Sequence, residues 1–364
     1  MRILGYLERY GLRGLMIKIF NKLNNIFFCL FYGAGSMEKY FFIKSKYENG
    51  TQKITLDMVR KYGRLVTVQE WNREKENEMD MLIENIVQGK QKFDDKYQVE
   101  IEYCRSKGEC MLYPYKFTEK YLEHQDEVQV YIEDIGKKHL KYVMHCGKKL
   151  YFPNIDSRDI RYQYTQLTME QDKLSPHVYF DDAFGGGIFV DVGSAEGIIS
   201  LEIVEHASEI YLIEGSKYWV RALEATFKDY KNKVHIINKY AGSENSKTTI
   251  RLDDILSKFI NQKIFIKMDI EGMEMEALSG CIETMKNNDC AFSCAAYHTN
   301  TMEKRLLSFF GQNGYKAQVS DGYMLFIYGH MTLQNGMYEK MEYPYFRHGL
   351  VRANKIKEND DELC

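Results

Sequence analysis

Short apolar runs alternate with longer segments of helical period between residues 188 and 328. Unbroken apolar runs of this kind are typical of strands buried on both faces of a parallel sheet, and the segments between them predict the helices that cover it. The expected strands are residues 188–192, 209–214, 234–237, 264–269, 290–297 and 323–328. One expected helix ends near residue 206, and the others cover residues 217–230, 273–287 and 302–312. The pattern therefore predicts an α/β fold whose strand carboxyl ends share one edge, where ligands bind.

The flanking regions have a different pattern. Residues 51–97 are polar with helical period, whereas 128–133 and 142–152 read as a strand and a hairpin that turns at Cys146–Gly147. A polar tail begins near residue 332. We therefore divide the chain into a helix over 1–31, an accessory α/β region over 32–155, a ligand-binding domain over 156–331 and a C-terminal tail over 332–364.

Residues 1–31 intersperse basic and apolar side chains at helical spacing, which predicts a basic amphipathic helix. Their continuous apolar run, residues 26–34, is much shorter than the roughly 20 residues that span a bilayer. The helix either packs on this protein or a partner, or lies on a membrane surface. A cytoplasmic protein, with peripheral contact at the inner face of the membrane as an alternative, is the expected location.

The composition limits the classes of function that the chain can have. The net charge of -3 offers no general attraction for nucleic acid, and 45% hydrophobic with 28% charged residues is typical of a globular protein. The eight cysteines form no C-x-x-C pair, so the sequence favours free thiols over a zinc site or a disulfide framework. The 364 residues suffice for two domains.

The first candidate site is the loop Asp191–Gly197, which follows the first strand. Gly193 permits a tight turn and Gly197 lets the next helix begin near the strand. A dinucleotide fingerprint requires a further glycine where Ala195 stands, which weakens a pyrophosphate-binding interpretation. An acidic residue at Asp191 suits an ammonium group, such as the one at the amino-acid end of S-adenosylmethionine.

Two further sites follow later strands. Glu214, 23 residues after Asp191, is placed to accept hydrogen bonds from ribose hydroxyls, although a surface glutamate at a helix start is the alternative. Lys267, Asp269 and Glu271 bring three charges to the end of an apolar strand. We interpret Glu274 and Glu276, on the helix that follows, as a solvated first turn.

These motifs together resemble the FkbM-type methyltransferase family. The resemblance rests on VDVGSAEG, YLIEG, Leu252–Ile255 and IKMDIEGMEMEAL with Gly280, and it covers about 150 residues. It implies a Rossmann-like class I methyltransferase fold, a mostly parallel sheet with helices on both faces. It also implies S-adenosylmethionine as methyl donor and O-methylation of hydroxyl groups, often on sugars or polyketides, in polysaccharide or natural-product biosynthesis.

Carried over position by position, the resemblance implies a set of cofactor-binding residues, with Ala241 near the adenine. Glu271 is a further expected cofactor-binding residue, because its place at the end of the fourth strand puts it beside the sulfonium. The chain departs from the family pattern at Ser194–Ala195–Glu196, where alanine, asparagine and a hydrophobic residue are more usual. The other expected cofactor-binding residues are Asp191, Gly193, Ser194, Gly197 and Glu214.

The expected catalytic residues are His298, Asp269 and Lys267. His298 follows the fifth strand and is the candidate base that takes the acceptor's proton, with Asp269 as the alternative base or as its orienting partner. We assign no metal site. Asp269, Glu271, His298 and Asn300 could instead collect a divalent cation that binds vicinal hydroxyls, and the sequence leaves this open.

The segment before the first strand is rich in polar side chains. We predict that Tyr164–Asp172 and Ser175–Tyr179 form a loop over the cofactor pocket. Its polar and aromatic residues are Glu170, Gln171, Asp172, His177 and Tyr179.

The expected function is an S-adenosylmethionine-dependent O-methyltransferase whose acceptor is a small molecule or a glycan, with no nucleic-acid partner. An NAD-dependent oxidoreductase is one alternative, because Glu214 could also hold a nicotinamide ribose. A non-catalytic scaffold with a methyltransferase-like fold is the other. The sequence does not predict the oligomeric state.

Overall fold

The computed structural model describes residues 41–45, 63–67, 81–135, 138–180, 184–326, 331–334 and 337–356. The predicted helix over 1–31 lies outside them. The chain divides into two compact units, Met1–Lys46 with Ile54–Asn72, and Tyr47–Lys53 with Arg73–Cys364. In the first unit, β1 (Phe41–Ser45) pairs antiparallel with β2 (Gly63–Thr67). The prediction of helical structure throughout 51–97 is therefore wrong at β2.

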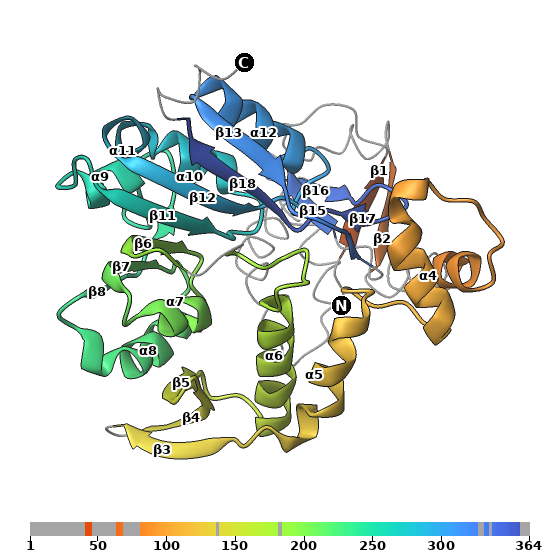
Figure 1. The fold of residues 1–364 in the computed structure, drawn as a ribbon, viewed down its shortest axis with the longest axis horizontal. Coiled ribbons are helices and arrows are strands. Elements are labelled where there is room, and N and C mark those ends of the chain that lie inside the picture. Colours follow the sequence, from red (N-terminus) through yellow and green to blue (C-terminus); the bar gives the residue numbers. More distant parts are fainter. Residues whose placement is uncertain are drawn as a thin grey trace, which may run out of the picture. The chain divides into compact units, whose positions relative to one another are not determined.

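A seven-stranded sheet forms the centre of the second unit (Figure 1). Its order is β13-β18-β12-β11-β6-β7-β8, and every neighbouring pair is parallel except the two that involve β18. Five of the strands were predicted within one or two residues, which confirms the mostly parallel α/β architecture. The seven are β6 (Gly187–Val192), β7 (Ala207–Ile213), β8 (Val234–Ile237), β11 (Lys263–Met268), β12 (Asp289–Ala295), β13 (Tyr315–Val319) and β18 (Leu350–Lys355).

Strand β18 corrects the predicted C-terminal tail, because it lies inside the sheet between β12 and β13. Leu350, Val351 and Ala353 are fully buried, and Arg352 is 9% exposed. The polar side chains of this short strand hide its apolar pattern. The last predicted strand, 323–328, is also wrong, because β14 (Met324–Leu325) pairs with β17 (Phe346–Arg347) outside the main sheet.

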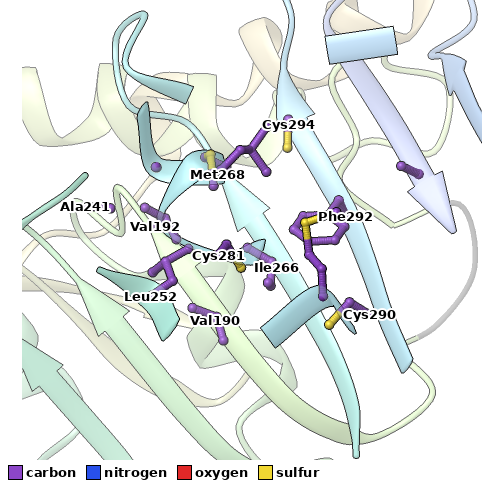
Figure 2. Packing of buried hydrophobic residues seen from close by; sticks show 14 of the residues in the cluster. Val190, Val192, Ala241, Leu252, Ile266, Met268, Cys281, Cys290, Phe292 and Cys294 are labelled. Atoms are coloured by element: carbon purple, nitrogen blue, oxygen red, sulfur yellow. The ribbon is translucent and has the colours of Figure 1, made fainter. Parts of the chain in front are cut away.

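Alternate residues of the central strands pack into two separate cores, as the two-residue repeat of a strand requires. Val190 and Val192 of β6 contribute to one core, whereas Phe189 contributes to the other. Figure 2 shows the first core, in which Ile266 and Met268 of β11 lie near Leu252 and Cys281. Burial of apolar side chains on both faces fixes the sheet and therefore the positions of its strand ends.

Helices cover both faces of the sheet. The predicted helix over 302–312 is confirmed, but the one over 273–287 is split at Gly280, where a Cβ would lie 2.2 Å from the carbonyl oxygen of Gly242. The close backbone contact therefore interrupts the helix. The helices are α7 (Ile198–Ile203), α8 (Lys217–Thr226), α9 (Leu252–Leu256), α10 (Glu274–Ser279), α11 (Ile282–Asn287) and α12 (Met302–Gln312).

Helix α6 (Ser157–Glu170) corrects half of the loop predicted over Tyr164–Tyr179. Asp156 caps it by accepting a hydrogen bond from the backbone N–H of Arg158, a typical helix-start interaction. Its buried face contains Ile160, Thr165 and Met169. The apolar pattern of this face is weak, which explains why it was missed.

The segment from residue 81 to β5 belongs to the same compact unit as the sheet, so the predicted boundary at 155 does not separate two domains. Leu150 and Phe152 pack into the core with Leu223 of α8. The hairpin predicted at Cys146–Gly147 is confirmed between β4 and β5. This segment contains a helix over 81–87, α4 (Gln98–Lys107), α5 (Glu119–Glu123), β3 (Tyr131–Ile135), β4 (Lys138–His145) and β5 (Lys148–Phe152).

The remaining elements are short. No helix in the described part of the chain has the length and apolarity needed to cross a membrane. The six described cysteines are free thiols. The short elements are the 3-10 turns Asp95–Tyr97, Lys116–Thr118, Gln125–Glu127 and Lys228–Tyr230, and the strands β9 (Tyr240–Ala241), β10 (Thr249–Ile250), β15 (Met331–Gln334) and β16 (Met337–Lys340).

Candidate active site

Four strands end at the same edge of the sheet with charged residues. Asp191 ends β6, Glu214 follows β7, Asp269 follows β11, and His298 comes after β12. Because these strands are parallel, their carboxyl ends converge there, where α/β sheets bind ligands. The topology therefore brings together the main residues that the sequence selected.

The glycine loop is shaped by contacts within the chain. Gly193 has a φ of +78°, and a Cβ there would lie 2.0 Å from the carbonyl oxygen of Asp269. Gly197 also has a φ of +78°, and its Cβ would lie 2.9 Å from both Leu223 and Phe227. Both positions favour glycine, as predicted. The turn at Gly193 thus packs against the end of β11.

Asp191 and Lys267 form a buried ion pair. Lys267 Nζ lies 3.0 Å from Asp191 Oδ1 and donates to the carbonyl oxygen of Gly193 at 2.6 Å. Ser200 donates to Asp191 Oδ2 at 2.7 Å. Burial opposes the charge of Lys267, but Asp191 and Asp269 together raise its pKa. Lys267 therefore stays protonated and anchors the glycine loop, and its expected catalytic role stays a prediction.

The Asp191 carboxylate is 1% exposed and already has two partners, so it faces the chain's own cation instead of an open pocket. The sequence suggested that this carboxylate would meet the ammonium group of a cofactor. The paired lysine was named from the sequence, but its contact with Asp191 was not foreseen. It follows from the parallel register, which sets Lys267 opposite Asp191.

Glu214 ties β7 to the glycine loop. Its Oε2 accepts from the backbone N–H of Ala195 at 3.0 Å, and its Oε1 accepts from that of Ser216 at 2.7 Å. Burial raises the pKa of this carboxyl. Each carboxylate oxygen can accept a further hydrogen bond. The position at the end of the second strand suits the predicted contact with ribose hydroxyls.

Two polar side chains of the glycine loop, Ser194 and Glu196, are buried. Ser194 Oγ has no hydrogen-bond partner among the described residues. Burial, with Glu170 and Asp191 nearby, raises the pKa of Glu196 to about 8 despite the attraction of Lys267. The sequence analysis did not select Glu196. Its signal was an acidic residue in a loop position where the family pattern has a hydrophobic one.

His298 lies between two carboxylates. Its Nδ1 is 2.7 Å from Glu274 Oε1, and its Nε2 is 3.2 Å from Asp269 Oδ1. Glu274 is 0% exposed and also accepts from the backbone N–H groups of Ile270 and Gly272, at 3.1 and 3.4 Å. The interpretation of Glu274 as a solvated helix start is therefore wrong, since it is a buried partner of the histidine.

These contacts fix the protonation of the pair. Burial alone would lower the pKa of His298, but Glu274 and Asp269 raise it well above its usual value. Burial would likewise raise the pKa of Asp269, yet its hydrogen bond with His298 and the nearby positive charges lower it strongly. His298 is therefore protonated at neutral pH with both nitrogens occupied. With both nitrogens occupied, His298 has no free lone pair in this structure, which does not favour its expected role as the free base.

The other candidate residues are less closely associated with this pair. The Glu271 side chain is 70% exposed, 3.8 Å from His298 Nε2. Asn300 Oδ1 accepts from the backbone N–H of Glu342 at 3.0 Å and from the side chain of Arg347. The cation set considered for Asp269, Glu271, His298 and Asn300 is therefore not assembled. Ala241 is buried in the core near Val192 and Leu252 (Figure 2).

Residues after α6 complete the site. Tyr179 donates from its hydroxyl to Asp269 Oδ2 at 2.7 Å. His177 Nδ1 lies 2.6 Å from Glu170 Oε1, and its Nε2 lies 3.9 Å from Asp269 Oδ2. The predicted polar segment thus reaches the end of β11, although its first half is helical.

Side chains of the sheet hold this segment in place. Ser293 of β12 donates to the carbonyl oxygen of Tyr179 at 2.8 Å, and Arg352 of β18 donates to that of Val178 at 2.5 Å. The backbone N–H of Tyr179 donates to Gln171 Oε1 at 3.2 Å. These bonds fix His177 and Tyr179 beside Asp269.

The sheet order and the site define the class of protein. Counted along the chain from β6, the strands stand in the order 6-7-5-4-1-2-3 with the last one antiparallel, which is the arrangement of the class I methyltransferase fold. A glycine loop after the first strand and an acidic residue after the second occupy the positions expected for this fold.

Residues 207–317 match the family model described as the Methyltransferase FkbM domain. This match begins at β7 and covers α10, whose motif carried the resemblance seen in the sequence. The resemblance and the expected fold are both confirmed. A comparison with curated proteins finds no match.

Solved structures with low identity also match. The methyltransferase FkbM from Methylobacillus flagellatus KT is 16% identical with a TM-score of 0.34, and the match covers 55% of each chain. The chain thus spans about half the length of that protein. Magnesium protoporphyrin IX methyltransferase from Synechocystis PCC 6803 is 13% identical with a TM-score of 0.31, over 73% of this chain and 99% of that one. An rRNA methylase from Streptococcus thermophilus is 13% identical with a TM-score of 0.29, over 47% and 88%.

Proposed function

We propose that this chain transfers a methyl group from S-adenosylmethionine to a hydroxyl of a carbohydrate or glycoconjugate. The observation that carries the proposal is the convergence of the glycine loop, Glu214 and the Asp269–His298–Glu274 network at one edge of a class I methyltransferase sheet. The first two suit the donor. The third lies where the acceptor would approach.

The donor's charges suit this edge of the sheet. Glu196 and Glu214 lie near the buried cation Lys267, which already pairs with Asp191. A ligand with a sulfonium and an ammonium group would supply the missing positive charge beside Glu196. Glu214 would accept hydrogen bonds from the ribose hydroxyls, and the unpaired Ser194 hydroxyl would donate to the carboxylate end. When bound, the cofactor supplies a methyl group on a positively charged sulfur.

The residues after β11 and β12 would position the acceptor. Asp269 is held by Tyr179 and His298, so its carboxylate keeps a fixed direction and can accept a hydrogen bond from an acceptor hydroxyl. Positioning of the oxygen for in-line attack is the larger part of this catalysis. Asp269 is too acidic, and His298 too fully protonated, to take the hydroxyl proton efficiently.

A polyhydroxylated acceptor suits the side chains near Asp269. Tyr297 OH lies 3.4 Å from each oxygen of Asp269, and the exposed Glu271 adds another hydrogen-bond acceptor. A sugar presents donors and acceptors to such groups. The choice of a carbohydrate rests mainly on the family resemblance, since folds of this class serve many acceptors.

Calorimetric titration with S-adenosylmethionine and with NAD tests the donor. Replacing Glu214 with glutamine should weaken S-adenosylmethionine binding about 10- to 100-fold, because a charged hydrogen-bond acceptor is lost. Glu209→Gln is the matched control, since Glu209 lies near the opposite end of β7 and pairs with Lys258 at 3.0 Å. Binding of NAD alone would overturn the proposal in favour of an oxidoreductase.

Transfer of a labelled methyl group to a panel of glycans and small hydroxylated molecules tests the acceptor. Label found in an alkali-stable ether of a sugar supports the proposal. Label confined to nitrogen, or absent although the donor binds, overturns it and favours another acceptor or a scaffold.

We also propose that the protein works in the cytoplasm and that residues 1–31 bring it to the inner face of a membrane. The support is the basic amphipathic pattern of those residues. Fractionation of cells that express the full chain or a form without residues 1–31 tests this. Unchanged membrane association after the deletion overturns it.

A further inference from the structure

His177 is buried without hydrogen bonds. Its side chain is 1% exposed, and neither ring nitrogen has a hydrogen bond of acceptable geometry among the described residues. Yet both nitrogens face carboxylates, because Nδ1 lies 2.6 Å from Glu170 Oε1 and Nε2 lies 3.9 Å from Asp269 Oδ2. Buried polar groups in proteins are nearly always hydrogen-bonded, so this exception needs an explanation.

A cation bound through one ring nitrogen and shared with the carboxylates explains the poor hydrogen-bond geometry at that nitrogen. Two ligands of one metal ion lie close together but direct their lone pairs at the ion, so their mutual geometry is poor for a hydrogen bond. One ligand atom each from Glu170, His177 and Asp269 all lie within 4.8 Å of one another. Such spacing is compatible with metal–ligand bonds of roughly 2.0–2.2 Å to nitrogen and oxygen.

In the two other clusters of potential ligands among the described residues, both nitrogens of the histidine already have partners. His298 is paired on both nitrogens, with Glu274 and Asp269. His145 Nε2 lies 2.9 Å from Glu202, and its Nδ1 lies 3.1 Å from the hydroxyl of Tyr164. Among the three clusters found in the described part of the chain, the one at His177 is therefore the one whose histidine lacks a hydrogen bond of acceptable geometry.

We propose that Glu170, His177 and Asp269 bind one divalent first-row transition-metal ion. An imidazole with two carboxylates suits manganese, iron or zinc, whereas magnesium and calcium favour oxygen ligands alone. Tyr179 and His298 each hold one oxygen of Asp269 and would orient it toward the ion. No ligand in this set comes from an exposed surface cluster, because all three residues are at least partly buried.

The role of the ion rests on the proposed methyl transfer. A hydroxyl oxygen bound to the ion would have a lowered pKa, which compensates for the lack of a free base in the Asp269–His298 pair. The hydroxyl proton leaves to solvent, and the resulting oxyanion forms the new carbon–oxygen bond as the carbon–sulfur bond breaks toward sulfur. Two adjacent hydroxyls of a sugar could both bind the ion.

Manganese alone is the probe for the binding test. The full-length protein, stripped of metal with a chelator and free of S-adenosylmethionine, is titrated with Mn²⁺, and free Mn²⁺ is followed by electron paramagnetic resonance. We expect one Mn²⁺ per chain. His177→Gln and Glu170→Gln should each weaken binding at least about tenfold, the effect typical of altering a metal's ligand shell.

His348→Gln is the matched control. His348 Nδ1 lies 2.8 Å from Glu303 Oε2, a histidine–glutamate pair that belongs to none of the ligand clusters, so Mn²⁺ binding should be unchanged. Circular dichroism confirms that each variant is folded. Absence of Mn²⁺ binding by the folded wild type, or equal binding by His177→Gln, overturns the site.

Two further measurements test the kind of metal and separate the metal site from the proposed function. If magnesium displaces manganese at equal concentration, the transition-metal assignment is overturned. S-adenosylmethionine binding is titrated on the same metal-free protein. Donor binding without Mn²⁺ binding removes the metal site but leaves the proposed function, whereas the reverse result removes the proposed function and leaves the metal site.

Discussion

His298 and His177 both lie near Asp269, but they differ in their hydrogen-bond partners. His298 is 8% exposed and has a carboxylate at each nitrogen, with Glu274 itself fixed by two backbone N–H groups. His177 is more deeply buried and has no hydrogen bond of acceptable geometry in the described structure. The ring nitrogens of His298 are thus hydrogen-bonded within the fold, whereas those of His177 have no well-formed hydrogen bond.

This difference separates structural from binding roles. A charged, fully paired histidine stabilises the ends of β11 and β12 but has nothing left to offer a ligand. A buried histidine without a well-formed hydrogen bond costs stability, and such costs are typical of binding sites. From the sequence alone, His298 was the more attractive functional candidate because it directly follows a strand. The hydrogen bonds reverse that ranking.

The largest expected effect on stability comes from removing a hydrogen-bond partner of His298. Glu274→Ala leaves the imidazolium of His298 with one partner and two backbone N–H groups without theirs. Loss of one partner from a buried charged pair typically costs about 3–5 kcal/mol. Urea unfolding should therefore show a large decrease in the free energy of unfolding.

Glu276→Ala is the control for this substitution, because Glu276 lies on the same helix and has no contact with His298. A loss below about 1 kcal/mol is expected there, as for most surface changes. Equal losses in the two variants would show that His298 does not depend on Glu274.

The next effect concerns the buried carboxyl group of Glu196. Its pKa in the folded protein is raised to about 8, whereas an unfolded glutamate titrates near 4.5. Between these values the folded state retains a proton that the unfolded state has released. Stability therefore falls as pH rises from about 4.5 to about 8 and is constant above that range.

Glu196→Gln removes this titration and should flatten the pH dependence. At pH 8 the variant should be more stable than the wild type, by an amount on the order of 3 kcal/mol, and near pH 4.5 the two should be similar. Urea unfolding between pH 4.5 and 8.5 measures the difference. A constant difference across the range would contradict the raised pKa.

A smaller effect is expected for Tyr179→Phe, which removes the hydrogen bond from the hydroxyl to Asp269 Oδ2. A hydrogen bond to a charged group contributes roughly 1.5–3 kcal/mol, and Asp269 keeps His298 as a partner, so we expect the lower end. Thermal unfolding of the metal-free protein measures the loss. Tyr162→Phe, at an exposed tyrosine of α6, is the control. Equal losses would show that Asp269 does not need this bond.

Much of the fold could be predicted because its strands are buried on both faces and therefore read as continuous apolar runs. Strand β8 (Val234–Ile237) and helix α12 (Met302–Gln312) have the predicted bounds. Strand β18 could not be predicted, because three of its residues, Arg352, Asn354 and Lys355, are polar. Its place between β12 and β13 depends on pairing with strands far away in the chain.

The site was predicted by residue type but not by contact. Asp191, Glu214, Asp269 and His298 do share one edge of the sheet, as their positions after parallel strands required. The pairing of Asp191 with Lys267 depends on strand register, which single positions do not reveal. Sequence patterns show which residues reach the edge. They do not show which of these residues pair with one another and are therefore less available to a ligand.

The smallest expected effect is also the sharpest test of the opening comparison. His177→Gln removes a ring that has no hydrogen bond of acceptable geometry in the described structure, so the metal-free protein should lose less than about 1 kcal/mol in urea unfolding. His298→Gln should lose several times more, since Glu274 and Asp269 then lack their cation. With Mn²⁺ present the difference between the two losses should narrow. The reason is that proteins which keep His177 gain stability from bound metal, whereas His177→Gln does not. Equal losses in metal-free protein would mean that His177 is structurally bonded and that the two histidines do not differ.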